Sequence, residues 1–139
     1  MSNSVLDRIA LIDIPRITDE DGRGSLSVVE GDIIPFAIKR AYYLYDIPSD
    51  ASRGGHAHRE LQQFLIALSG SFDVVLDDGE HRRTFTLNRP YRGLLIPSGI
   101  WRELENFSAG AVCLSLVSAT YDEADYIRDY KQFRSFKDR

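Results

Sequence analysis

Short runs of β-favouring residues, separated by turn-forming residues, succeed one another along most of this chain. The clearest example is the alternation of Phe72, Val74 and Leu76 with polar residues, followed by DDG at 77–79 and a second run at 81–87. This pattern is typical of a β-hairpin. Roughly ten short strands joined by turns imply a closed or sandwiched all-β fold. We predict strands at 5–14, 25–30, 36–45, 62–69, 72–76, 81–87, 93–96, 100–105 and 112–116.

The end of the chain departs from this β pattern. The acidic run 122–125 places carboxylates where they favour the first turn of a helix. Apolar side chains then recur at helical spacing over 126–130. We therefore expect a short helix that starts at the acidic run, followed by a polar tail in which Phe133 and Phe136 are exposed.

The composition fits one globular domain spanning 1–139. The chain has 139 residues, of which 43% are hydrophobic and 27% charged. A net charge of −4 argues against nucleic acid as a partner, because domains that bind it usually carry a basic excess. The single cysteine, Cys113, cannot form an internal disulfide, which favours a reducing, cytoplasmic location. No stretch reaches the roughly 18 apolar residues of a membrane span, so we expect no membrane partner.

Two of the three histidines, His56 and His58, are separated by a single residue. In a β-strand, residues i and i+2 point to the same face, so both imidazoles can point into a barrel. Two imidazoles on one inner face suit either metal binding or proton transfer. For an isolated His-x-His sequence, a pair of packing or surface histidines is an equally good explanation.

Two segments, 56–70 and 97–106, carry a more specific pattern. The first reads HAH, four residues, Gln63, six residues and a glycine. The second reads PSG, two residues, Arg102, three residues and an asparagine. Their spacing resembles the two cupin motifs, HxH-x4-E-x6-G and PxG-x2-H-x3-N. The resemblance implies an all-β cupin fold, a double-stranded β-helix or jelly-roll barrel, here with a short C-terminal helix.

The two departures from these motifs fall on metal-ligand positions. A metal-binding cupin would use both histidines, a glutamate and a third histidine, whereas this chain has Gln63 and Arg102. A neutral amide is a poor substitute for a carboxylate, and a guanidinium stays protonated and offers no lone pair. Two good ligands remain, against three in a catalytic zinc site. We expect no metal and no cofactor, with a metal-dependent isomerase as a weak alternative.

Four segments resemble the dTDP-sugar 3,4-ketoisomerases, which are cupin enzymes without a metal. They are IKRAYYLY (38–45), RGGHAH (53–58), LDDG (76–79) and YDEADYIRDY (121–130). The resemblance implies that the enzyme moves the keto group of dTDP-4-keto-6-deoxyglucose from C4 to C3. The product leads to 3-amino-sugars of surface polysaccharides, such as O-antigen, or of antibiotics. The resemblance also implies a homodimer, with the N-terminal strand and the C-terminal segment as candidate contacts.

The resemblance places the catalytic base on His56, with Tyr42 and His58 as assisting groups. The residue types suit the chemistry, since removal of the C3 proton, an enediol and reprotonation at C4 need a base that titrates near neutral pH. Unperturbed histidine has a pKa of about 6.5. Arg40 shares a strand face with Tyr42 and is a candidate donor to the enediolate.

The expected substrate-binding residues are Arg40, Arg53, Gln63 and Arg102. A dTDP group carries a diphosphate, which arginine binds well. Six arginines are candidates for it: Arg53, Arg59, Arg82, Arg83, Arg92 and Arg102. Three aromatic residues are candidates for stacking on thymine: Tyr43, Tyr91 and Phe107.

Two alternative functions keep the same site. A 3,5-epimerase abstracts protons next to the same ketone, so one histidine serves it equally well. A non-catalytic cupin would only bind the sugar nucleotide. Deuterium uptake at C5 distinguishes the epimerase, and binding without solvent-proton exchange into the substrate distinguishes the non-catalytic protein.

Overall fold

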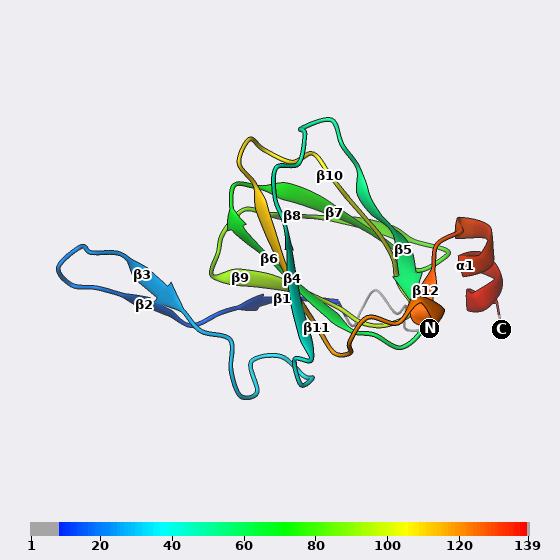
Figure 1. The fold of residues 1–139 in the computed structure, drawn as a ribbon, viewed down its shortest axis with the longest axis horizontal. Helices are drawn as coiled ribbons and strands as arrows, with labels where there is room; N and C mark the ends of the chain where they lie inside the picture. The colour runs from blue at the N-terminus through cyan, green and yellow to red at the C-terminus, as the bar shows by residue number, and fades with distance from the viewer. Residues whose placement is uncertain (1–8, 139) are drawn as a thin grey trace.

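Two five-stranded antiparallel sheets face each other and enclose the interior of the protein (Figure 1). They are seen in a computed structural model that describes residues 9–138, so part of the first expected strand, 5–8, lies outside the described residues. Within residues 9–138 the chain forms twelve strands and, near its C-terminal end, one short α-helix. The all-β fold with a short C-terminal helix, predicted from the sequence, is confirmed.

Each sheet combines strands from distant parts of the chain. The first, called the β6 sheet after its central strand, contains β1 (Ala10–Asp13), β9 (Arg92–Ile96), β6 (Gln63–Ser69), β11 (Val112–Val117) and β4 (Arg40–Leu44), in that spatial order. The second, the β10 sheet, contains β12 (Tyr126–Ile127), β5 (Arg53–His58), β10 (Trp101–Glu105), β7 (Phe72–Asp77) and β8 (Arg82–Leu87). Residues far apart in the sequence therefore meet on the inner faces.

The alternation of side chains along the strands directs apolar residues of both sheets into one core. On β7, Phe72, Val74 and Leu76 are buried, as their alternation predicted. They share a cluster with Leu94 and Ile96 of the β6 sheet. Removing these apolar surfaces from water is the main favourable contribution to folding.

The outer face of the β6 sheet is also covered. The segment 28–36 lies over it, and Ile34 belongs to one cluster with Phe64 and Leu116. The Phe64 ring lies so close to Gly93 that a Cβ there would be 2.1 Å from a ring carbon. Only glycine fits at that position without moving the ring, which ties β9 closely to β6.

The C-terminal region differs from the sequence prediction. The acidic run forms a 3-10 turn (Glu123–Asp125) with Asp122 as its N-cap, not the start of an α-helix. The next two residues form β12 by pairing with β5, which interrupts the helical spacing. Helix α1 (Tyr130–Lys137) begins only after this strand, and it buries Phe133 completely against the β10 sheet, so the expected exposure of Phe133 is wrong. No helix within residues 9–138 is long and apolar enough to cross a lipid bilayer.

A hairpin of two short strands, β2 (Arg16–Thr18) and β3 (Ser25–Ser27), projects away from the two sheets (Figure 1). The two strands pair only with each other in the described part of the chain. Ile17 and Leu26 on this hairpin are 62% and 55% exposed. A two-stranded hairpin is marginally stable in water by itself. The β2–β3 hairpin therefore presents apolar side chains to whatever surrounds it.

Candidate active site

A cavity of about 220 Å³ lies between the inner faces of the two sheets. Six of the seven site residues proposed from the sequence line it: Arg40, Tyr42, Arg53, His56, Gln63 and Arg102. The seventh, His58, is buried beside His56 and is not part of the cavity wall. Leu65 and Leu104 belong both to this wall and to the apolar core, so the site rests directly on the core of the barrel.

The two histidines lie next to each other on β5. Their Nε2 atoms are 3.1 Å apart in a hydrogen bond, so the spacing correctly placed both rings on one face. The antiparallel pairing of β5 with β10 sets Arg102 opposite His56, and the pairing with β12 sets Tyr126 opposite His58. The Tyr126 ring contacts both imidazoles, with centroid distances of 5.0 and 4.4 Å. The two rings are thus held by both neighbouring strands.

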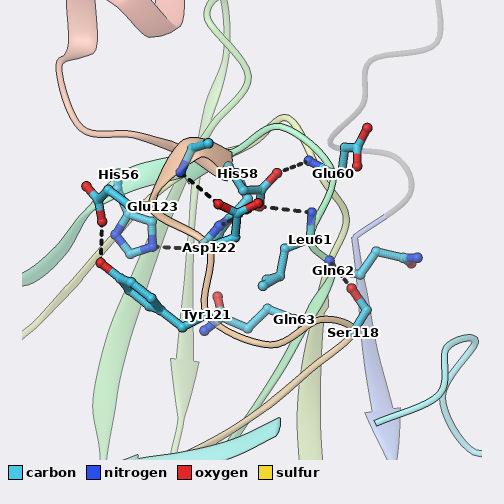
Figure 2. Close-up of polar contacts among 12 residues, drawn as sticks. His56, His58, Glu60, Leu61, Gln62, Gln63, Ser118, Tyr121, Asp122 and Glu123 are labelled. Carbon is cyan, nitrogen blue, oxygen red and sulfur yellow. Dashed lines mark hydrogen bonds and ion pairs between the residues drawn. The ribbon is translucent and has the colours of Figure 1, made fainter. Parts of the chain in front are cut away.

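Asp125 contacts His58 from the side remote from His56. Its Oδ2 lies 3.1 Å from His58 Nδ1, and His58 is only 1% exposed. The backbone N–H groups of Glu60 and Leu61 donate to the same carboxylate, as the dashed lines ending at these residues in Figure 2 show. Asp125 was not predicted as a site residue, because the acidic run to which it belongs is typical of a helix start. Its position depends on the pairing of β12 with β5.

Both histidines are neutral at pH 7 in the folded protein. Burial, followed by the positive charge of Arg102, lowers the pKa of His56 to about 2. Burial, followed by the charges of Arg102 and Arg128, lowers the pKa of His58 to about 3. Both values are far below the ordinary pKa of about 6.5 on which the sequence argument rested. A neutral imidazole carries a lone pair, so it accepts a proton without first having to lose one.

A second set of polar side chains joins the two sheets across the cavity. Arg102 donates from Nη1 to Gln63 Oε1. Gln63 Nε2 donates to Tyr42 Oη at 2.8 Å and to Ser115 Oγ at 2.7 Å. Because both amide hydrogens are used, Tyr42 Oη acts as an acceptor here and keeps its own hydrogen for another partner. Tyr42 lines the cavity, so this hydroxyl is a donor available to a ligand.

Arg102 is a fully buried cation. Its side chain is 0% exposed, and Nη2 donates to the carbonyl oxygen of Ile100 at 2.9 Å. Burial lowers the pKa of Arg102 to about 10, which leaves it charged at neutral pH. Within residues 9–138 its Nε–H has no hydrogen-bond partner. A buried donor without a partner is costly, so this group suits an oxygen atom of a ligand in the cavity.

Arginines dominate the rest of the polar wall. Three more line the cavity: Arg40, Arg53 and Arg128. The Arg40 guanidinium lies over the Tyr42 ring at 4.7 Å, and Arg128 forms a bidentate pair with Glu123 at 2.6 and 2.9 Å. Arg128 and Tyr126 were not predicted as site residues, although both belong to the C-terminal segment that carries the family resemblance. The excess of positive charge suits an anionic ligand.

The remaining candidates from the sequence lie elsewhere. Four arginines have partners outside the cavity: Arg59, Arg82, Arg83 and Arg92. The aromatic candidates for thymine are not part of the cavity wall either: Tyr43, Tyr91 and Phe107. Cys113 does line the cavity, but burial raises the pKa of its thiol to about 12. That thiol is not a nucleophile at neutral pH.

The side chains of this cavity do not suit a metal ion. Residues 9–138 contain no group of three or more His, Cys, Asp or Glu side chains placed to bind one. Gln63 and Arg102 stand at two ligand positions of the cupin motifs, and they are bonded to each other, because the Gln63 carbonyl oxygen accepts from Arg102. A metal cation at that place would meet the fixed positive charge of a buried guanidinium.

Two facing sheets around a His-x-His site define this protein as a cupin-type barrel. The model of one family, described as FdtA (WxcM-like, C-terminal), matches residues 7–138. The chain belongs to this family.

Three relatives illustrate the similarity. The TDP-4-oxo-6-deoxy-alpha-D-glucose-3,4-oxoisomerase of Aneurinibacillus thermoaerophilus is 44% identical over 117 residues, which are 84% of each chain. A 3,4-ketoisomerase from Helicobacter canadensis has a crystal structure with a TM-score of 0.90 and 45% identity, over 94% of this chain and 98% of that one. A mutant of the 3,4-ketoisomerase QdtA from Thermoanaerobacterium thermosaccharolyticum, solved with TDP-4-keto-6-deoxyglucose, has a TM-score of 0.89, 40% identity and 93% coverage of each chain.

Proposed function

We propose that this protein is an isomerase that converts TDP-4-keto-6-deoxyglucose into its 3-keto isomer through an enediol. The observation that carries the proposal is the placement of neutral His56 in one cavity with the donors of Tyr42 and Arg102. The three relatives are named as 3,4-oxo- or 3,4-ketoisomerases, and one is bound to this keto-sugar. The reaction only moves protons and electron pairs within the sugar, so the protein has to supply acids and bases alone.

The proposed reaction moves one proton between carbons and one between oxygens. A base removes the C3 proton while O4 gains a proton, which gives the enediol. O3 then loses its proton while C4 gains one, which leaves the ketone at C3. Because C3 and C4 are adjacent, one base serves both carbons if the sugar is held in place. We assign this base to His56, whose neutral ring lines the cavity. The negative charge of the bound substrate opposes that of Arg102 and raises the pKa of the ring toward the range that proton transfer needs.

We assign the oxygen side of the reaction to Tyr42 and Arg102. The Tyr42 hydroxyl has its hydrogen free for the sugar, because Gln63 occupies it only as an acceptor. It can therefore carry the proton between O3 and O4. The unpartnered Nε–H of Arg102 stabilises the negative charge of the enediolate, and preorganised donors of this kind contribute strongly in a site that excludes water. Gln63 is hydrogen-bonded to both Tyr42 and Arg102 and positions them. His58 contacts His56 and not the sugar, so its role is to position His56.

The nucleotide lies at the edge of the cavity in this proposal. A volume of about 220 Å³ is smaller than the roughly 300 Å³ at which ligand pockets begin, so it suits the hexose ring alone. Guanidinium groups bind phosphate oxygens in pairs of parallel hydrogen bonds. Three arginines of the wall are therefore assigned to the diphosphate: Arg40, Arg53 and Arg128.

The test is to incubate the purified protein with TDP-4-keto-6-deoxyglucose in deuterated water and to follow the sugar by NMR. We expect a 3-keto product. Deuterium uptake at C5 would instead indicate an epimerase, and binding without product or exchange would indicate a non-catalytic protein. Either of those results overturns the proposal.

We further propose that two copies assemble through the β2–β3 hairpin into a dimer that works in the cytoplasm and supplies surface-polysaccharide synthesis. Ile17 and Leu26 are exposed on this hairpin, and a second copy would cover them. We expect the double substitution Ile17→Asp and Leu26→Asp to produce monomers in sedimentation equilibrium. Ser27→Asp, on the same exposed strand, is the control. A monomeric wild-type protein, or a dimer that survives the double substitution, contradicts the proposed contact.

A further inference from the structure

Asp125 ends a continuous chain of hydrogen bonds that begins at the cavity wall. Its carboxylate contacts His58 Nδ1, and His58 Nε2 contacts His56 Nε2, both at 3.1 Å. His56 lines the cavity, whereas His58 and Asp125 do not. In Figure 2 a dashed line leaves the labelled His56 ring for its contact with His58, and the two rings meet edge to face. Asp125 thus reaches the substrate site only through the two rings.

The carboxylate determines where the ring hydrogens lie. Its Oδ1 accepts from the Glu60 N–H at 2.8 Å, and its Oδ2 accepts from the Leu61 N–H at 3.3 Å. With both oxygens acting as acceptors, the contact with His58 places the hydrogen of that ring on Nδ1. A neutral imidazole has one such hydrogen, so His58 Nε2 is an acceptor. His56 therefore donates from Nε2 and keeps its lone pair on Nδ1.

We propose that Asp125 is a positioning residue that sets the tautomer of His56 through His58, and that His56 Nδ1 is the atom that takes the carbon-bound proton. The inference rests on the proposed function, in which His56 is the base. In the step itself the C3–H bond breaks, an Nδ1–H bond forms, and the electron pair stays in the enediolate. The same proton later returns to carbon at C4. With the opposite tautomers, the only lone pair of His56 would face His58 and not the substrate.

The first test reads the tautomers without any activity measurement. The chain has three histidines, so protein labelled with ¹⁵N-histidine gives three ring patterns, and His81→Gln identifies one of them. Long-range ¹H–¹⁵N correlation at neutral pH is expected to show hydrogen on Nδ1 of His58 and on Nε2 of His56. Hydrogen on Nε2 of His58, or on Nδ1 of His56, overturns the inference whether or not the enzyme turns over its substrate.

The second test is Asp125→Asn, which keeps the shape of the side chain and inverts the hydrogen bonds. We expect the amide oxygen to stay on the Glu60 N–H, the shorter of the two backbone bonds, which turns the amide NH₂ toward His58. His58 Nδ1 must then accept, and the hydrogen of His56 moves to Nδ1. Because a wrong tautomer disables a catalytic histidine, kcat is expected to fall about 100-fold at nearly constant KM. The Leu61 N–H then loses its acceptor, so the thermal midpoint is expected to fall by a few degrees while the fold is retained.

The matched control is Asp122→Asn in the same turn. Asp122 accepts from the Ala124 N–H at 3.1 Å, and no hydrogen bond joins it to either histidine in the described part of the chain. We expect its kcat to stay within about twofold of wild type.

The outcomes separate this inference from the proposed function. If the wild-type protein forms the product, a wild-type kcat in Asp125→Asn, or an equal loss of kcat in Asp122→Asn, contradicts the inference alone. Absence of product from the wild-type protein contradicts the proposed function instead. If Asp125→Asn does not fold, the histidine tautomers measured in the wild-type protein test the inference by themselves.

Discussion

Two chains of polar side chains reach the cavity, and they present opposite groups to it. The histidine chain consists of Asp125, His58 and His56. The guanidinium chain consists of Arg102, Gln63, Tyr42 and Ser115. The first reaches the cavity at His56, to which we assign a lone pair, and the second reaches it at Tyr42 and Arg102, which are hydrogen-bond donors. The histidine chain accepts protons, and the guanidinium chain donates them.

The contrast shows how a small cavity performs proton transfers in both directions. Loss of a proton from carbon needs an acceptor, and the charge that then develops on oxygen needs donors. The two chains also influence each other, because Arg102 lies opposite His56 in the sheet and its charge helps to lower the pKa of that ring. The donor chain thereby keeps the acceptor unprotonated.

The largest effect is expected from removing the lone pair of the histidine chain. His56→Asn keeps a polar side chain that can donate to His58, but it has no basic nitrogen. We expect kcat to fall by about 10³-fold or more, measured by NMR of the keto-sugar, while the fold is retained. His81→Asn, at an exposed position outside the cavity, is the control. Near-normal turnover by His56→Asn would mean that another residue is the base.

The next effect is expected from removing the charged end of the guanidinium chain. Arg102→Met keeps most of the side-chain volume but removes the donors, and loss of such a donor is expected to lower kcat about 100-fold. The free energy of unfolding in urea is expected to change by less than about 2 kcal/mol, because relief of a buried charge offsets the hydrogen bonds lost at Gln63 and Ile100. Arg89→Met on the surface is the control. If Arg102→Met keeps the wild-type kcat, Arg102 takes no part in the reaction.

A smaller effect is expected from breaking the guanidinium chain at its centre. Gln63→Glu still accepts from Arg102 but cannot donate, so the Tyr42 hydroxyl turns toward the new carboxylate and away from the sugar. We expect kcat to fall about tenfold. The protein is expected to stay folded, because the new carboxylate forms an ion pair with Arg102. Gln62→Glu is the matched control, because the Gln62 side chain points away from the histidines in Figure 2. If both variants keep wild-type kcat, Gln63 does not orient Tyr42.

The barrel core was predictable from the sequence because its signals are local. The alternation on β7 and the turn that follows it specify a hairpin within a few residues. The helix start was not predictable, because the competing interaction is long-range. Pairing of Tyr126–Ile127 with β5, together with burial of Ile127, outweighs helix propensities of a few tenths of a kcal/mol per residue.

The same distinction applies to the candidate site. The spacing of His56 and His58 follows from one strand, so the sequence alone placed the rings together. Asp125 reaches His58 across 67 positions of the chain, and only the strand pairing next to it brings it there. The low pKa values of the two histidines were equally hidden, because they depend on burial and on Arg102 in a neighbouring strand.

The last effect is expected in stability at acid pH and not in turnover, and it concerns the two rings of the histidine chain. An unfolded histidine binds a proton below about pH 6.5, whereas the folded protein protonates His56 near pH 2 and His58 near pH 3. Between these limits the unfolded chain binds more protons, so the free energy of unfolding falls as the pH is lowered, by up to about 1.4 kcal/mol per pH unit for each ring. His56→Asn removes one ring, so urea unfolding between about pH 6 and pH 4 should show a slope smaller by roughly that amount. Equal slopes would mean that folded His56 titrates like an unfolded histidine, and the lone pair assigned to it at neutral pH would no longer follow from burial.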